Sequence, residues 1–158
     1  MTIEEAKRRT LRLADLESAV EEVERVLASG YERRGNWSLG QICRHLRLTQ
    51  DASIDGYPRW MSLFAPVRPL FRVLLLPRLL DGNSMAGLPT VSIYVPSEDS
   101  EDAIEVDEYK RSVKRFWEHK GTFHPHPGFG IRERDSLDRF HAAHAAHHLG
   151  FLKPSRDD

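Results

Sequence analysis

Apolar residues recur at helical spacing along several stretches of the chain. The clearest stretch covers residues 15–29, where apolar side chains follow one another at steps of three and four: Leu16, Ala19, Val20, Val23, Val26 and Leu27. Such steps place these side chains on one face of a helix, and Gly30 supplies a stop signal. The sequence therefore predicts a first helix over about residues 15–29.

A second helix begins with a capping sequence. In Ser38-Leu39-Gly40-Gln41, the Ser38 hydroxyl and the Gln41 amide can each satisfy a free backbone N–H group at the helix start. Residues at helical spacing then continue the inward face: Ile42, His45, Leu46, Thr49 and Ser53. The helix is expected to end near residue 56, and the pattern predicts that His45 points into the interior.

Between residues 57 and 97, the apolar residues follow no long helical or strand period. A turn sequence over residues 81–84 and four prolines interrupt it: Pro58, Pro66, Pro69 and Pro77. We expect a short apolar helix near residues 67–80 and an extended segment over residues 88–95. A connection of this length usually carries a function or crosses between helices, so this one is a candidate lid.

A third helix follows, with acidic residues at its start and basic residues before Gly121 at its end. The acidic residues complement the helix dipole, and we interpret them as a solvated helix start rather than a cation site: Glu98, Asp99, Glu101 and Asp102. The core face is predicted from four residues: Ala103, Val106, Val113 and Phe116.

The last helix follows a loop over residues 121–133 and runs from about Asp135 or Ser136 to Leu149, with Asp135 as the expected capping residue. Four helices of bundle length, with a long crossover between the second and the third, predict an all-α fold, an antiparallel four-helix bundle. We expect one domain over residues 1–158, with the bundle over about 12–152, the long connection over 57–97 and a tail over 153–158.

The composition narrows the classes of partner and compartment. A chain of 158 residues suits one compact domain, and 23 basic against 24 acidic residues argue against nucleic acid as a partner. The single cysteine, Cys43, excludes an internal disulfide and a multi-cysteine zinc site. The apolar stretch over residues 70–80 is about half of the roughly 20 residues that span a bilayer, and no apolar signal region follows the charged start. We therefore expect a cytoplasmic protein that acts on a small molecule, has no membrane partner and can form a homodimer.

Histidine is concentrated in the last third of the chain, where six of the eight histidines lie between residues 124 and 148. On the last helix, His141, His144 and His148 share a face with Leu137 and Phe140, so a face expected to be apolar carries three imidazoles. The alternative is a solvated, histidine-rich helix face. The phase argues against it, because desolvating several unpartnered imidazoles costs on the order of 1–3 kcal/mol each.

Two of these histidines have the spacing of metal ligands. His144 and His148 are one turn apart, which lets two imidazoles of one helix bind a single ion. His45 is the only histidine on the inward face of another predicted helix, which makes it the candidate third ligand, although a lone buried histidine is more often a hydrogen-bonded core residue. Three neutral imidazoles with further positions open are typical of a catalytic metal site, and imidazole ligands without thiolates favour zinc or nickel.

Several motifs together resemble the DinB/YfiT-like superfamily of metal-dependent proteins over about residues 10–152. They are Asn36-Trp37-Ser38, Arg44-His45-Leu46, the HPGFG sequence over residues 126–130, and the HAAHHL sequence over residues 144–149. The chain looks closest to an uncharacterised branch with the HPxFG segment. The resemblance implies an antiparallel four-helix bundle that holds one divalent ion through His45, His144 and His148. Characterised relatives include thiol-cofactor-dependent transferases and isomerases, which makes a low-molecular-weight thiol a candidate cofactor.

Other residues have more open roles. His141 departs from the minimal pattern of the superfamily, so it is a fourth ligand, a base or a partner of a ligand. His126 precedes a proline in the loop that enters the last helix, and it either carries a proton at the mouth of the bundle or stabilises the turn. Gln41 and Thr49 lie one turn on either side of His45, which makes them candidate contacts to a cofactor or substrate.

Two classes of function fit these residues. The first is a metal-dependent enzyme, and thiolate activation is favoured over hydrolysis because no carboxylate lies near the histidines on the inward faces. The base would then be His141, His126 or a metal-bound ligand. The second class is a non-catalytic bundle that is stabilised by its metal and binds a protein partner.

Overall fold

The computed structural model describes residues 8–83 and 90–155, and it is mostly helical. The four long helices are α1 (Leu16–Ser29), α2 (Leu39–Asp55), α5 (Asp102–Glu118) and α6 (Arg134–Leu149). Shorter helices lie between α2 and α5: η2 (Arg59–Val67), α3 (Arg68–Leu74), α4 (Leu76–Leu80) and η3 (Ser92–Tyr94). Two short strands pair antiparallel, β1 (Tyr31–Arg33) with β2 (Leu152–Pro154). The predicted helical class is confirmed, whereas this pair of strands was not predicted.

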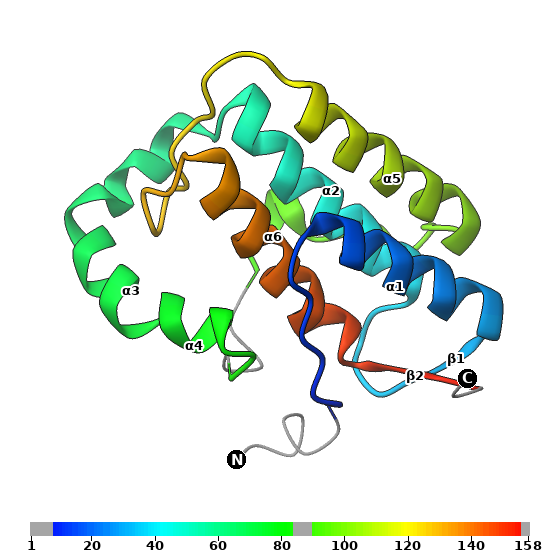
Figure 1. Cartoon of the computed structure of the whole chain (residues 1–158). Helices are drawn as coiled ribbons and strands as arrows, with labels where there is room; N and C mark the ends of the chain where they lie inside the picture. Colours follow the sequence, from blue (N-terminus) through cyan, green and yellow to red (C-terminus); the bar gives the residue numbers. More distant parts are fainter. Residues whose placement is uncertain (1–7, 84–89, 156–158) are drawn as a thin grey trace.

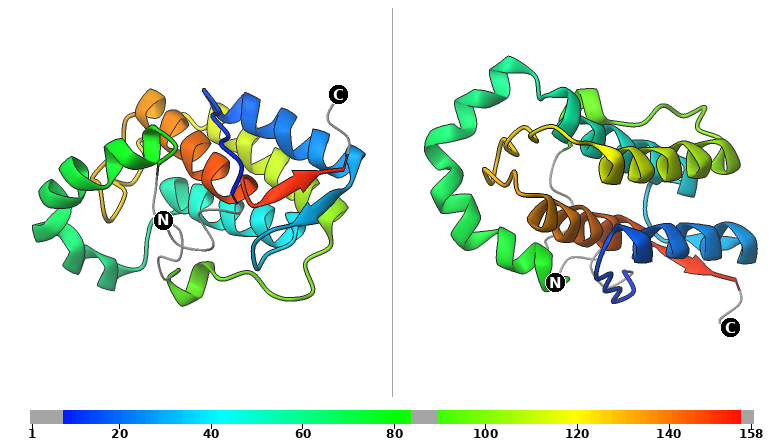
Figure 2. Two further views of the ribbon diagram at one scale, coloured as in Figure 1. Left: turned by 90° about the horizontal axis from the view of Figure 1, so that it is seen from below. Right: turned by 45° about the horizontal axis from the view of Figure 1, so that its top comes forward.

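The four long helices pack on one another around a common core. α2 lies along α5, α1 contacts both α5 and α6, and α2 also contacts α6 (Figure 1; Figure 2). The largest fully buried side chains come from all four helices and include Leu16, Ile42, Tyr109 and Leu137. The second and last of the long helices therefore contact each other across the core, as predicted from the positions of their histidines.

Side chains fix the starts of α1 and α2. The predicted capping box of α2 is confirmed, because Gln41 N–H donates to Ser38 Oγ over 3.2 Å and Ser38 N–H donates to the Gln41 side-chain oxygen over 2.9 Å. At the start of α1, Leu16 N–H donates to the carboxylate of Asp138, on α6, over 2.8 Å. The N-cap of α1 is the local residue Asp15, which accepts from Ser18 N–H over 2.8 Å, whereas the bond to Asp138 comes from a distant part of the chain and no local sequence pattern predicts it.

Two helix starts differ from the prediction. The capping position of α6 is Glu133, whose backbone is extended, so Asp135 lies inside the first turn and is not the cap. Its negative charge there still complements the helix dipole. α5 begins at Asp102 rather than near residue 98, because a turn closed by Ser100 Oγ and the Ser97 carbonyl precedes the helix.

The acidic start of α5 is only partly solvated. Three of its residues are exposed, as predicted: Glu98, Asp99 and Glu101. Asp102 instead accepts hydrogen bonds from Gly40 N–H and from the Tyr31 hydroxyl, each over 2.7 Å, and so joins α5 to the start of α2. Ala103 is exposed, so its predicted place on the core face is wrong, whereas the other three residues predicted for that face are buried.

This close approach of α5 requires a glycine at position 40. A Cβ atom on Gly40 would lie 2.7 Å from the backbone oxygen of Ser100. Gly40→Ala is therefore expected to lower the free energy of unfolding by about 1–3 kcal/mol, the usual cost of overpacking. Urea denaturation checks this against Lys114→Ala, an exposed substitution on α5 that should cost less than about 0.5 kcal/mol. Equal midpoints for the two variants would contradict the prediction.

Residues 57–83 form an arm that leaves the four long helices and returns to α6. In Figure 1 the arm curves along the left of the molecule through η2, α3 and α4, and α4 contacts α6. The helix predicted over residues 67–80 is interrupted at Leu75, between α3 and α4. The helical turns of η2 were not predicted, because the prolines of this segment obscured their period.

Among the described residues, no helix has both the length and the apolar character needed to cross a membrane.

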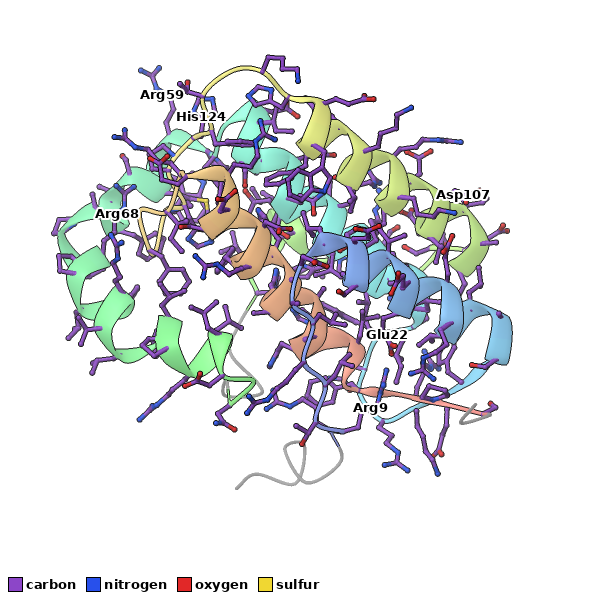
Figure 3. All side chains as sticks on the ribbon, viewed as in Figure 1. Arg9, Glu22, Arg59, Arg68, Asp107 and His124 are labelled. Atoms are coloured by element: carbon purple, nitrogen blue, oxygen red, sulfur yellow. The ribbon has the colours of Figure 1, made fainter. Side chains whose placement is uncertain are left out.

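A hydrogen bond joins the arm to the loop before α6. Arg68 Nε donates to the carbonyl of Pro127 over 2.7 Å, which ties the arm to the loop before α6 (Figure 3). The extended segment predicted over residues 88–95 is wrong over Ser92–Tyr94, which form the 3₁₀ turn η3, whereas the backbone of Val95 is extended. Residues 88 and 89 lie outside the described residues.

Candidate metal centre

Three histidines from two helices converge at one point. His45 is on α2, and His144 and His148 are one turn apart on α6. His144 Nε2 lies 3.2 Å from His45 Nε2 and 3.0 Å from His148 Nε2, and one ligand atom of each residue lies within 4.8 Å of the others. The packing of α2 on α6 therefore brings together the three residues that the sequence analysis selected as ligands.

The protons on the three rings show why this arrangement suits a cation. His45 Nδ1 donates to the Tyr94 carbonyl over 2.8 Å, so the neutral ring has a lone pair and no proton on Nε2. His144 Nε2 carries either one proton or one lone pair, yet it faces both other Nε2 atoms. At least one of the two close contacts therefore lacks a full hydrogen bond when all three rings are neutral. A cation between the nitrogens would accept all three lone pairs.

The spacing of the nitrogens agrees with this interpretation. Zinc–nitrogen bonds of about 2.0–2.1 Å place two ligand nitrogens about 2.8–3.4 Å apart at coordination angles between about 90° and 109°. Two of the three separations, 3.2 and 3.0 Å, fall in that range, and the ligand atoms of the third pair, His45 and His148, lie within 4.8 Å of each other. The three residues can thus hold one divalent ion.

The electrostatic surroundings keep the imidazoles neutral. Burial lowers the pKa of His45 from its ordinary value of 6.5, although the bond to the Tyr94 carbonyl opposes the shift. Burial also lowers the pKa values of His144 and His148 well below 6.5, and neighbouring imidazoles lower both further. At neutral pH the nitrogen lone pairs are therefore available to a metal.

Two residues that the sequence analysis did not select position the ligands. Trp37 stacks on His148, with ring centroids 5.4 Å apart and an interplanar angle of 20°, and its centroid lies 5.0 Å from that of His45. The Tyr94 carbonyl orients His45 from η3. Trp37 directly precedes the capping residue of α2, so its position was a usable signal, whereas no local pattern places Tyr94 beside α2.

A cavity of about 650 Å³ is lined by all three histidines. The arm contributes Met61, Phe64 and Phe71 to its wall, and the loop before α6 contributes His126 and Phe129. No Asp, Glu, Lys or Arg is among the described residues that line it, and its polar side chains other than histidine are few: Asn36, Thr49, Tyr57, Thr90 and Tyr94. Such a wall suits a small, largely apolar molecule with few polar groups.

His141 does not converge with the three histidines. It is buried, it is not among the residues that line the cavity, and its Nε2 lies 3.0 Å from Ser53 Oγ. Ser53 Oγ in turn lies 3.1 Å from the hydroxyl of Tyr57, which does line the cavity. The polar connection of His141 to the cavity runs through this chain of hydrogen bonds, so a direct catalytic contact to a substrate does not follow from its position.

His126 lines the cavity, as its predicted role at the mouth of the bundle requires. Its Nδ1 accepts from Gly128 N–H over 3.1 Å, which leaves the proton of the neutral ring on Nε2. Its ring stacks on Phe129 with centroids 5.0 Å apart. His126 thus stabilises the turn and at the same time offers an N–H donor, so the two roles left open by the sequence are compatible.

The two predicted cofactor contacts differ in position. Thr49 lines the cavity, although its hydroxyl donates back to the carbonyls of His45 and Leu46. Gln41 does not line it, because its amide closes the capping box of α2. The prediction of a cofactor contact at Gln41 therefore gets no support from the geometry.

Cys43 is buried, and burial raises the pKa of its thiol, so it is a core residue rather than a nucleophile.

The buried histidines outside the converging set predict acid sensitivity. Burial lowers the pKa of His126 to about 4 and that of His141 to about 3. As pH falls below 6.5, the unfolded chain binds protons that the folded chain does not, so the free energy of unfolding falls by about 1.4 kcal/mol per pH unit for each histidine. Urea denaturation of metal-free protein between pH 6.5 and 4.5 should show a steeper fall for the wild type than for His126→Gln. Parallel curves would contradict this.

Residues 5–155 match a family that is described as "Protein of unknown function (DUF1569)". The chain belongs to the DUF1569 family. The matched region contains all four long helices and all three histidines of the candidate metal centre. No curated protein and no solved structure matches the chain. Membership of the DUF1569 family assigns no activity.

Proposed function

We propose that this member of the DUF1569 family is a metal-dependent enzyme on an antiparallel four-helix bundle, with one divalent ion held by His45, His144 and His148. The convergence of three neutral imidazole nitrogens on the wall of a 650 Å³ cavity carries the proposal. Zinc or nickel is the favoured metal, because the ligand set holds imidazoles and no thiolate. The motifs that resemble the DinB/YfiT-like superfamily support the same ligands and the same bundle.

The lining of the cavity favours thiol chemistry over hydrolysis. A bound metal would supply a Lewis acid that holds the thiolate of a low-molecular-weight cofactor. No carboxylate among the described lining residues is available as a base for water activation. His126 and the hydroxyl of Tyr57 supply polar groups at the wall, and the aromatic side chains of the arm exclude water from a small apolar substrate.

Metal analysis and spectroscopy of a cobalt-substituted sample test the proposal. We expect one metal ion per chain and a cobalt spectrum that changes when a low-molecular-weight thiol is added, because the thiolate takes an open coordination position. A protein without bound metal after purification and after titration with zinc, nickel and cobalt would refute the proposal. A bound cobalt ion whose spectrum does not change with added thiol and shows no exchangeable water ligand would instead indicate a non-catalytic, metal-stabilised module.

A further inference from the structure

The arm carries a long apolar stripe on its outer side. The stripe runs at alternating steps of three and four residues through η2 and α3, and its side chains are exposed by 48, 78, 38, 56 and 52%: Trp60, Leu63, Val67, Leu70 and Leu74. Val73, beside the stripe, is 71% exposed. In most helices an apolar stripe of this length packs against another part of the protein. Because these side chains are exposed, no part of the described chain covers the stripe.

The cavity does not explain this stripe. A second set of side chains, each one residue further along the chain, faces the cavity from the same arm: Met61, Phe64 and Phe71. Ten of the thirteen exposed large apolar side chains in the described part of the molecule belong to residues 60–95, and eight of those ten to the arm. Figure 1 shows the arm on the periphery, away from α1 and α5. The exposure is therefore a property of this arm and not of the surface in general.

The charge of the arm is as one-sided as its hydrophobicity. The arm, residues 57–83, contains four arginines and one acidic residue, Asp81 at the end of α4, although the whole chain has a net charge of −1. Arg59, Arg72 and Arg78 are exposed, and Figure 3 shows Arg59 projecting from the arm. Arg68 is partly buried and donates to the Pro127 carbonyl. Three guanidinium groups thus accompany the apolar stripe.

We infer that the outer stripe of the arm docks on the surface of an anionic lipid bilayer. Exposed Leu, Val and Trp side chains along a helical segment can insert between lipid headgroups, and exposed arginines of the same segment can bind lipid phosphates. The expectation of no membrane partner rested on the absence of a membrane-spanning helix. Binding at the surface of a bilayer does not require a spanning helix. The inference does not depend on the metal centre, because the stripe and the converging histidines share no residue.

The charges disfavour the other simple occupant, a second copy of this chain. A symmetric pair formed through the stripe would bring the four arginines of each copy together, with one acidic residue per arm, Asp81, to oppose them. An anionic bilayer provides both the apolar interior and the opposite charge. A protein partner remains distinguishable by experiment, because it would give no binding to pure lipid.

Flotation with lipid vesicles tests the inference on the full-length chain. We expect binding to vesicles of phosphatidylcholine mixed with phosphatidylglycerol, weaker binding to phosphatidylcholine alone, and loss of binding as salt is raised. The doubly substituted Leu63→Glu, Leu70→Glu protein should fail to bind. Ile104→Glu is the matched control, because Ile104 is 57% exposed on α5 and should leave binding unchanged.

A charge series completes the experiment. Each arginine near an anionic surface is worth about 1 kcal/mol, which is about fivefold in the partition coefficient. Arg59→Gln and Arg72→Gln should each reduce binding by about that factor, with circular dichroism as a check of folding. No binding of the folded wild type to anionic vesicles, or equal binding of the doubly substituted protein, would overturn the inference. A concentration-dependent dimer that Leu63→Glu abolishes would also overturn it and would assign the stripe to a second copy.

Discussion

His148→Ala is expected to abolish tight zinc binding. The substitution removes one of three converging nitrogens, and His144 Nε2 then keeps only His45 as a close neighbour. The loss of affinity should exceed the roughly 10–100-fold that removal of a hydrogen-bond partner behind a ligand costs, because a ligand itself is lost. Competition titration with a chromophoric chelator measures the effect. The same reasoning applies to the other two converging histidines.

His147→Ala is the matched control. His147 neighbours His148 and lines the same cavity, but its Nδ1 lies 2.6 Å from the guanidinium of Arg8 and does not join the converging set. Zinc at about 1,000 times its dissociation constant stabilises a folded protein by about 4 kcal/mol. The thermal midpoint should therefore rise with zinc for the wild type and His147→Ala, and stay unchanged for His148→Ala. The reverse order would show that the ligand set is wrong.

The second large effect concerns His141, for which we expect lower stability with zinc affinity retained. The ring is buried, and removing it leaves a cavity and takes a hydrogen-bond partner from the buried Ser53. His141→Ala should lower the free energy of unfolding by about 2–4 kcal/mol, as measured by urea denaturation. Zinc titration of the same protein should give the wild-type affinity, because the nitrogens that converge come from other residues.

His141→Phe separates volume from hydrogen bonding. Phenylalanine fills most of the space of the imidazole but removes the hydrogen bond to Ser53, which keeps its contact with the Tyr57 hydroxyl, so the expected loss is smaller, about 1–3 kcal/mol. A zinc affinity that collapses in both variants would make His141 a fourth ligand. The candidate metal centre would then be closed by four imidazoles, and the case for an enzyme would lose its structural basis.

Local patterns in the sequence predicted much of the helical framework. The apolar steps of α1 and the capping box of α2 each involve residues within a few positions of one another, and both agree with the structure. The periodicity of α6 also placed His144 and His148 on the inward face together with Leu137. These predictions succeeded because backbone conformation and the face of a helix depend on neighbours in sequence.

Local sequence patterns did not predict which way the side chains of the arm face, or the contacts at the start of α5. Apolar residues occupy most positions of residues 57–80, so no period distinguishes the side that faces the cavity from the side that faces outward. Asp102 looked like any acidic residue at a helix start, yet it binds Gly40 N–H on α2. The side that each apolar residue of the arm faces and the partner that Asp102 binds both depend on contacts with distant parts of the chain.

For the metal centre, the residue types and their spacing on α6 followed from the amino-acid order, and the third ligand followed from the face of α2. The meeting of three Nε2 atoms, the proton held on His45 by the Tyr94 carbonyl and the aromatic wall of the cavity are properties of the packed chain. The physical reason is the range of the forces. Helix faces are set by hydrogen bonds between residues four apart, whereas a coordination point is set within tenths of an ångström by the packing of helices far apart in sequence.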